Sequence, residues 1–95
     1  MSHSATDPLD ERALLLAARA GDEHAFGQLV GRYRQGLEQF CYLMLGDKHD
    51  AAGAVEETVL RAWLERELAE SAAPAKMWLY RIAISECLDE CDGRR

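Results

Sequence analysis

The sequence has few cysteines, only two prolines and no long apolar run. No stretch approaches the roughly 20 apolar residues that cross a bilayer, and "MSHSATDPLDERA" lacks the basic start and apolar core of a secretory signal. The three cysteines are an odd number without the spacing of a disulfide framework. These absences argue against a membrane-spanning or disulfide-rich secreted protein. We expect a cytoplasmic protein with reduced thiols.

Positive charge is also scarce. Eleven lysines and arginines stand against 17 aspartates and glutamates, which gives a formal net charge of -6. Such a chain is repelled by a phosphate backbone unless positive charge is gathered locally. Composition alone therefore argues against nucleic-acid binding.

The motifs of common enzymes and metal sites are missing as well. The sequence has no glycine-rich phosphate loop, no nucleophile elbow and no His-Glu pair at metalloprotease spacing. His3, His24 and His49 are scattered over the terminus and the expected helix starts, where solvated histidines are commoner than metal ligands. We expect a protein that is not an enzyme and has no cofactor or bound metal.

What the sequence does contain is helical periodicity, in a chain long enough for one compact core. Asp7 and Pro8 are typical of a helix start, and Gly21 is typical of its end. Asp22 is suited to cap a second helix that stops at Gly46. The apolar face of this second helix consists of Phe26, Leu29, Val30, Tyr33, Leu37, Phe40, Met44 and Leu45.

Two further helices are expected, one over about 50–68 and one that starts at Pro74 and ends near Cys91 or Gly93. The inward residues of the third helix are expected to be Ala51, Val55, Val59, Ala62 and Trp63. Trp63 and Trp78 are expected to anchor the core. Since no period-two alternation appears, the predicted fold class is all-α, a compact bundle of about four helices. Residues 1–7 are expected to form a tail and 8–93 a single domain.

Two pairs of reactive side chains have simple interpretations. Cys87 and Cys91 are four apart, so on a helix they share a face and could join a metal site or oxidise with distortion, but packed thiols are the favoured interpretation. Glu56 and Glu57 are adjacent and point about 100° apart, so they cannot act as a paired acid and base.

A family resemblance gives these helices a function. The stretch "ARAGDEHAFGQLVGRYRQGLEQFCYLMLGDKHDAAGAVEETVLRAW" resembles the opening half of region 2 of bacterial RNA polymerase sigma factors, especially the extracytoplasmic-function group, and "WLYRIAISECLD" resembles its closing helix. In that family "AGD" followed by "AF" opens the long second helix, "LGD" ends it, and "WLYRIA" begins the fourth. The motifs occur in the family's order over about residues 13–91.

The resemblance implies a domain that binds core RNA polymerase, through the clamp helices of the largest subunit, with its third helix. The matching positions are Asp50, Glu57, Leu60 and Arg61. The simpler interpretation of Glu57 and Arg61 is a helix-surface ion pair, and an exposed Arg61 predicts that Arg61→Ala leaves folding nearly intact.

The third helix also departs from the family pattern at two positions. Gly53 replaces a residue that is often acidic in the family, and Glu56 replaces one that is usually glutamine. A glycine within a helix costs about 1 kcal/mol relative to alanine, and it removes a side chain that could contact the clamp. We therefore expect polymerase affinity to be weaker than is usual in the family.

The resemblance also implies contact with the promoter minus-ten element. The matching or basic residues are Lys76, Tyr80, Arg81, Arg94 and Arg95. The segment "RELAESAAPAK" contains no aromatic residue, and its two acidic and two basic residues balance. Where the family usually has Arg-Asn, this chain has "IS", followed by the acidic "ECLDECD". We expect weak affinity for promoter DNA, because single-strand binding needs positive charge and stacking groups.

Three functions stay open. The first is the region 2 domain of an alternative sigma factor, without a region 4 helix-turn-helix in this sequence, that assists promoter recognition and melting. The second is a sigma-like interaction module that binds an anti-sigma factor or another regulator through its acidic fourth helix. The third is a thiol or metal sensor that uses Cys87 and Cys91.

Overall fold

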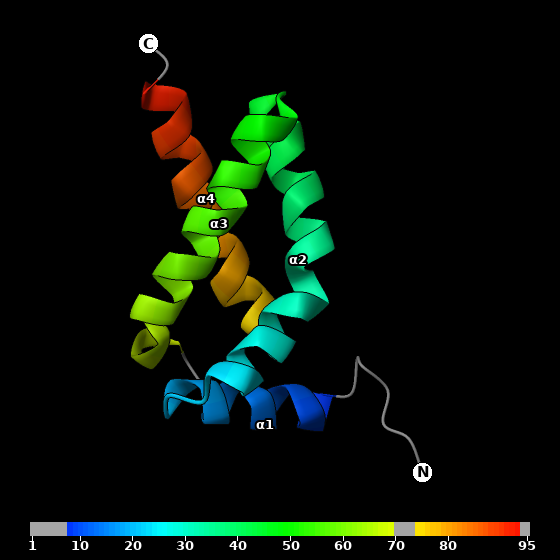
Figure 1. The fold of residues 1–95 in the computed structure, drawn as a ribbon, viewed down its shortest axis with the longest axis vertical. Helices are drawn as coiled ribbons and strands as arrows, with labels where there is room; N and C mark the ends of the chain where they lie inside the picture. Colours follow the sequence, from blue (N-terminus) through cyan, green and yellow to red (C-terminus); the bar gives the residue numbers. More distant parts are fainter. Residues whose placement is uncertain (1–7, 70–73, 94–95) are drawn as a thin grey trace.

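The computed structural model describes residues 8–69 and 74–93, which form four α-helices and one short 3-10 helix (Figure 1). The elements are α1 (Pro8–Arg19), α2 (Glu23–Leu45), α3 (Lys48–Leu64), η1 (Arg66–Leu68) and α4 (Ala75–Gly93). The predicted all-α fold of about four helices is confirmed. Asp7, the expected cap of the first helix, lies outside the described residues.

The helix ends follow from local capping. The Asp22 carboxylate accepts a hydrogen bond from the Ala25 N–H at 3.1 Å and begins α2, and Gly46 ends α2 in the left-handed conformation at φ 74°. Asp47 then accepts from the Asp50 N–H at 2.9 Å. The third helix therefore begins at Lys48, two residues earlier than expected, because Asp47 is its cap.

The helices make an elongated bundle whose extents are 49 × 26 × 20 Å. Figure 1 shows α2 and α3 as neighbours joined by a tight turn, α4 crossing behind α3, and α1 lying crosswise beneath the other helices. Helix α4 contacts both α2 and α3, and α1 contacts chiefly α2. No helix in the described part of the chain is long and apolar enough to cross a membrane.

The core is built largely from small side chains, which let the helices approach closely. Buried alanines at the contacts among the four helices include Ala18, Ala51, Ala54, Ala62 and Ala83. The larger fully buried apolar side chains are Leu29, Leu37, Leu79 and Val55. This small-residue packing explains how a chain of 95 residues forms a closed core with few aromatic residues.

Several expected core positions need correction. Met44 is exposed, and Cys41, one turn after Leu37, takes the buried place instead. Trp63 and Trp78 are only partly buried and pack against the edge of the core rather than at its centre. On α3, Ala54 and Thr58 are buried although the sequence pattern did not select them. The reason is that α3 packs against both α2 and α4. Its buried face is therefore wider than the single apolar stripe of a helix that packs against one neighbour.

Gly36 lies where α2 meets the side chain of Tyr80 on α4. A Cβ atom at Gly36 would lie 2.6 Å from the Tyr80 hydroxyl oxygen. The Tyr80 ring packs edge-on against Phe40, with ring centroids 5.4 Å apart. Gly36 therefore provides the space in which Tyr80 lies.

Glu11 connects the crosswise α1 to two other helices. One carboxylate oxygen of Glu11 accepts a hydrogen bond from the Tyr33 hydroxyl on α2, and the other accepts from the Ala75 N–H at the start of α4, at 3.4 Å. Burial, followed by the bond to the Glu11 carboxylate, raises the pKa of Tyr33 to about 12. This contact holds the lower end of the bundle together.

Candidate functional site: the outer faces of α3 and α4

The outer face of α3 carries a row of exposed leucines. Leu60 and Leu64, with Leu68 in the following η1, are between 52 and 73% exposed. Glu57 is exposed and lies one turn before Leu60 and two turns before Leu64. Leucines this exposed and this closely spaced are typical of a surface that binds another protein. The sequence analysis selected Leu60 alone; the spacing of four residues between the leucines was the signal for the other two.

Asp50, Glu57 and Arg61 lie along one side of α3, because they are seven and four residues apart. Asp50 lies in the first turn, and its N–H is bonded to Asp47. The structure thus places the four predicted polymerase-binding residues on one helix, with Leu60 beside the row of charged residues.

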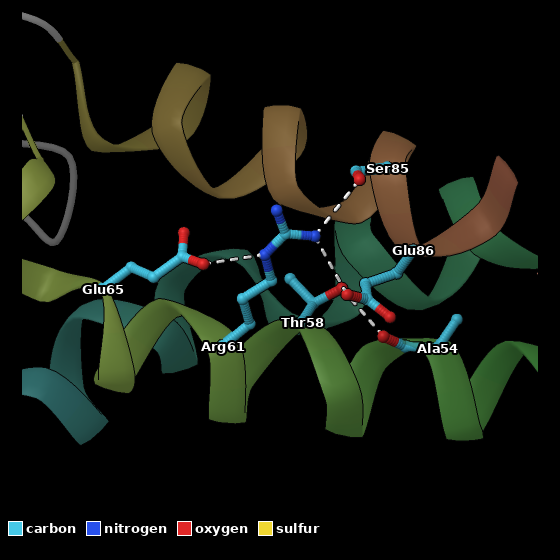
Figure 2. A network of polar contacts seen from close by, with 6 residues as sticks. All are labelled: Ala54, Thr58, Arg61, Glu65, Ser85 and Glu86. Atoms are coloured by element: carbon cyan, nitrogen blue, oxygen red, sulfur yellow. Dashed lines mark hydrogen bonds and ion pairs between the residues drawn. The ribbon is translucent and has the colours of Figure 1, made fainter. Parts of the chain in front are cut away.

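Arg61 does not form the expected surface pair with Glu57. Figure 2 shows its guanidinium between α3 and α4: Nε contacts the Glu65 carboxylate at 3.0 Å, and Nη1 contacts Glu86 at 3.2 Å and the Ser85 hydroxyl at 3.1 Å. The hydrogen bonds to Glu65 and Glu86 raise the pKa of Arg61 above its ordinary value. The helix-surface pair of Glu57 and Arg61 was therefore a wrong interpretation, since Arg61 joins two helices.

The Thr58 hydroxyl, which lies beneath this network, has its hydrogen-bond partner within α3. Thr58 is fully buried, and its hydroxyl donates to the Ala54 carbonyl at 2.7 Å (Figure 2). A buried hydroxyl without a partner would cost free energy, so this bond allows Thr58 to face α4.

A shallow groove of about 360 Å³ runs beside Leu60 on the side of α3 that faces α2. Its lining residues are Glu23, Phe26, Glu56, Val59, Leu60 and Trp63. The rings of Phe26 and Trp63 pack with centroids 5.1 Å apart, and two carboxylates stand at the groove. Sequence reasoning missed this groove because Glu23 and Phe26 come from α2, some 30 residues away.

Among the predicted DNA-binding residues that the structure describes, no single basic surface forms. Lys76 is exposed, with its ammonium 5.7 Å from the centre of the Tyr80 ring, and Arg81 is exposed. Tyr80 is half-buried between α2 and α4 and is not free to stack on a base. Arg94 and Arg95 lie outside the described residues.

Arg66, in the η1 segment that precedes α4, also contacts other residues of its own chain. Arg66 lies 4.1 Å from the centre of the Trp63 ring and donates to the Trp63 carbonyl at 2.8 Å. Within α4 the basic residues are Lys76 and Arg81, whereas the acidic residues are Glu86, Asp89, Glu90 and Asp92. Arg81 is therefore the one exposed cation in the middle of α4.

The outer face of α4 carries a stripe of exposed apolar side chains. Met77, Ile84 and Leu88 are 42 to 54% exposed. They share this face with Arg81 because the four residues follow one another at intervals of four, three and four. The sequence analysis noted Ile84 as a departure but did not identify the stripe.

The three cysteines gather where α2 and α4 meet. Cys41 and Cys87 are fully buried and Cys91 is partly buried against the same cluster, and all three are free thiols. Burial, with the hydrogen bond to Cys41, raises the pKa of Cys87 to about 12, so this thiol is a poor nucleophile at neutral pH. Within 8–69 and 74–93, no group of three or more His, Cys, Asp or Glu residues could hold a metal ion.

Comparisons with known proteins agree with this fold. A family model described as "Sigma-70 region 2" matches residues 29–95. The chain is 39% identical over 93 residues to the ECF RNA polymerase sigma factor SigG of Mycobacterium tuberculosis, covering 98% of this chain and 22% of that protein. It is 34% identical over 71 residues to the ECF sigma factor SigW of Bacillus subtilis, covering 75% and 38%. The chain thus spans less than half the length of these relatives.

Two solved structures are also similar. An engineered region 2 of sigmaE in complex with GTAAAA matches with a TM-score of 0.82 and 23% identity, covering 88% of this chain and 87% of that one. CnrH in complex with the cytosolic domain of CnrY matches with a TM-score of 0.78 and 30% identity, covering 84% and 52%.

Proposed function

The chain belongs to the sigma-70 region 2 family, and from this premise we propose that it binds core RNA polymerase and contributes to promoter minus-ten recognition and melting. The observation that carries the proposal is the outer face of α3, with its row of exposed leucines beside Asp50 and Glu57. A non-catalytic role of this kind acts in the bacterial cytoplasm, where the polymerase is.

The proposed partner surface is the pair of clamp helices of the largest polymerase subunit. A helix pair fits an exposed helix that offers apolar anchors with charged residues around them. Leu60 and Leu64 supply the anchors, Glu57 supplies charge beside Leu60, and Asp50 lies at the start of the same helix. The groove floored by Phe26 and Trp63 gives a partner side chain a place to insert next to Leu60.

The proposed contribution to promoter binding is weak for this domain alone. Of the five residues considered for DNA contact, Lys76 and Arg81 are exposed, and both stand on the helix that carries four carboxylates. A phosphate-binding helix normally has the opposite balance. We therefore propose that polymerase docking, rather than affinity for DNA, brings α4 to the promoter.

A second proposed function is binding of an anti-sigma factor. It is favoured by the solved complex of CnrH with the cytosolic domain of CnrY, since CnrH is 30% identical to this chain over the matched region. The acidic and apolar α4 offers such a partner a surface with little affinity for DNA. A chain that binds the partner but not core polymerase would favour this function over the first.

The test is binding of the chain to core RNA polymerase, measured by fluorescence anisotropy. We expect Leu60→Ala and Glu57→Ala each to weaken binding about tenfold, because each removes an exposed contact from the centre of the proposed surface. Leu43→Ala is the matched control, since Leu43 is an exposed leucine on α2. Equal affinity of all three variants and the unaltered chain would show that α3 is not the docking face.

A further inference from the structure

The outer face of α4 has the pattern of a helix that packs against another helix. Met77, Arg81, Ile84 and Leu88 follow at intervals of four, three and four, which is the spacing of a heptad seam. The three apolar members are about half exposed. The seam points away from the core, which α4 contacts through Leu79, Ile82, Ala83 and Cys87.

The charges along α4 are arranged so that the helix complements itself. Arg81 stands in its first half, and Asp89 and Asp92 stand in its last turns. A second copy that runs in the opposite direction brings the basic half of one helix onto the acidic half of the other. A parallel copy would instead place Arg81 against Arg81, which is repulsive.

The helix dipoles also favour the opposite direction. Antiparallel neighbours place the positive end of one helix dipole beside the negative end of the other. Another carboxylate on α4, Glu86, contacts Arg61 of its own chain and lies on the side of α4 that faces α3, away from the seam. An isologous contact of this kind closes on itself and yields a dimer rather than a filament.

We propose that the outer face of α4 pairs antiparallel with the same face of a second copy of the chain. Ile84 and Leu88 of one copy pack against Leu88 and Ile84 of the other, and each Arg81 lies near the acidic last turn of the opposite helix. A single helix pair buries less area than the interfaces of stable complexes, so the dimer is weak and depends on concentration.

The pairing has a consequence that rests on the proposed function. Arg81, an exposed basic residue in the middle of α4, is covered in the dimer. Self-association therefore competes with promoter contact through α4 while leaving the leucine row of α3 accessible. The chain would be held in a form that can dock on the polymerase but cannot contact DNA through α4.

Sedimentation equilibrium of the 95-residue chain tests the pairing without polymerase or DNA. Between about 10 µM and 1 mM, a range in which weak interfaces associate, the mass is expected to rise from 10.6 kDa toward twice that value. Ile84→Glu should stay monomeric throughout, and Leu43→Glu, which alters an exposed leucine on α2, should behave like the unaltered chain. Circular dichroism confirms that each variant is folded.

A charge complementation experiment tests the antiparallel arrangement. Arg81→Glu alone, and Asp89→Lys with Asp92→Lys, should each reduce self-association at least tenfold, because each creates like charges across the seam. An equimolar mixture of the two variants should restore it. A monomer at 1 mM, a dimer that survives Ile84→Glu, or a mixture that stays monomeric would each overturn the proposal. Loss of polymerase binding would leave it intact, so the two proposals fail separately.

Discussion

Arg61 contacts two residues of α4, Ser85 and Glu86, as well as Glu65 on its own helix. On sequence alone the simpler interpretation paired it with Glu57, since a glutamate four residues before an arginine is the favourable order on an isolated helix. In the structure the Arg61 side chain points toward α4 instead, where its guanidinium contacts Glu86. The side chain is still 38% exposed, so a role in docking and a role in joining α3 to α4 are compatible.

We predict that Arg61→Ala lowers the free energy of unfolding by about 0.5–1 kcal/mol, rather than leaving it unchanged. The magnitude is that of partly exposed ion pairs, which water and salt screen. Urea denaturation measures the change, and Glu57→Ala is the control because Glu57 is exposed on the same helix. Equal midpoints for the two variants would mean that the contacts to Ser85 and Glu86 contribute nothing to stability.

At the scale of the helices, the sequence correctly predicted the stops and starts of α2 and the number of helices, because caps and left-handed glycines act locally. The start predicted for α3, at about residue 50, was wrong, because Asp47 caps this helix and Asp50 lies within its first turn. The sequence did not predict which glycines matter for packing. Gly53 in α3 has no atom within 4 Å of an added Cβ, whereas Gly36 in α2 faces the Tyr80 hydroxyl.

We predict opposite effects for the same substitution in these two helices. Gly53→Ala should raise the free energy of unfolding by about 1 kcal/mol through helix propensity, because the added methyl group meets nothing. Gly36→Ala should lower it by about 1 kcal/mol, since displacing Tyr80 outweighs the same gain. Thermal denaturation measures both.

A second substitution isolates the cause at Gly36. Tyr80→Phe removes the hydroxyl that an alanine at position 36 would strike at 2.6 Å. Adding it to Gly36→Ala should recover stability relative to the single variant. If the double variant is no more stable than Gly36→Ala, the loss arises from something other than the hydroxyl.

At the scale of the whole molecule, Glu11 joins α1 to α2 and α4 through partners 22 and 64 residues away in the sequence. The pKa of Tyr33 is raised from 10 to about 12 in the folded protein. The unfolded chain therefore loses this proton first, so Tyr33 contributes full stability below pH 10. That contribution is lost as pH rises from 10 toward 12.

We predict that the free energy of unfolding falls between pH 10 and 12, and that Tyr33→Phe makes this fall less steep. Cys87 adds a loss of the same sign that begins near pH 9, because its pKa is also raised to about 12. Urea denaturation at a series of pH values measures both slopes. A Tyr33→Phe profile identical to that of the unaltered chain would show that Tyr33 ionises alike in the folded and unfolded states.

The sequence by itself determined the helices, the all-α class and the family, because capping residues, apolar periodicity and ordered motifs all act within short stretches of chain. Only the tertiary structure decided which side chains are free to bind a partner. Arg61 and Glu86 are 25 residues apart, and Tyr80 fits only beside Gly36 on another helix. Such contacts depend on how the helices cross, and the spacing of residues along one helix carries no information about that crossing.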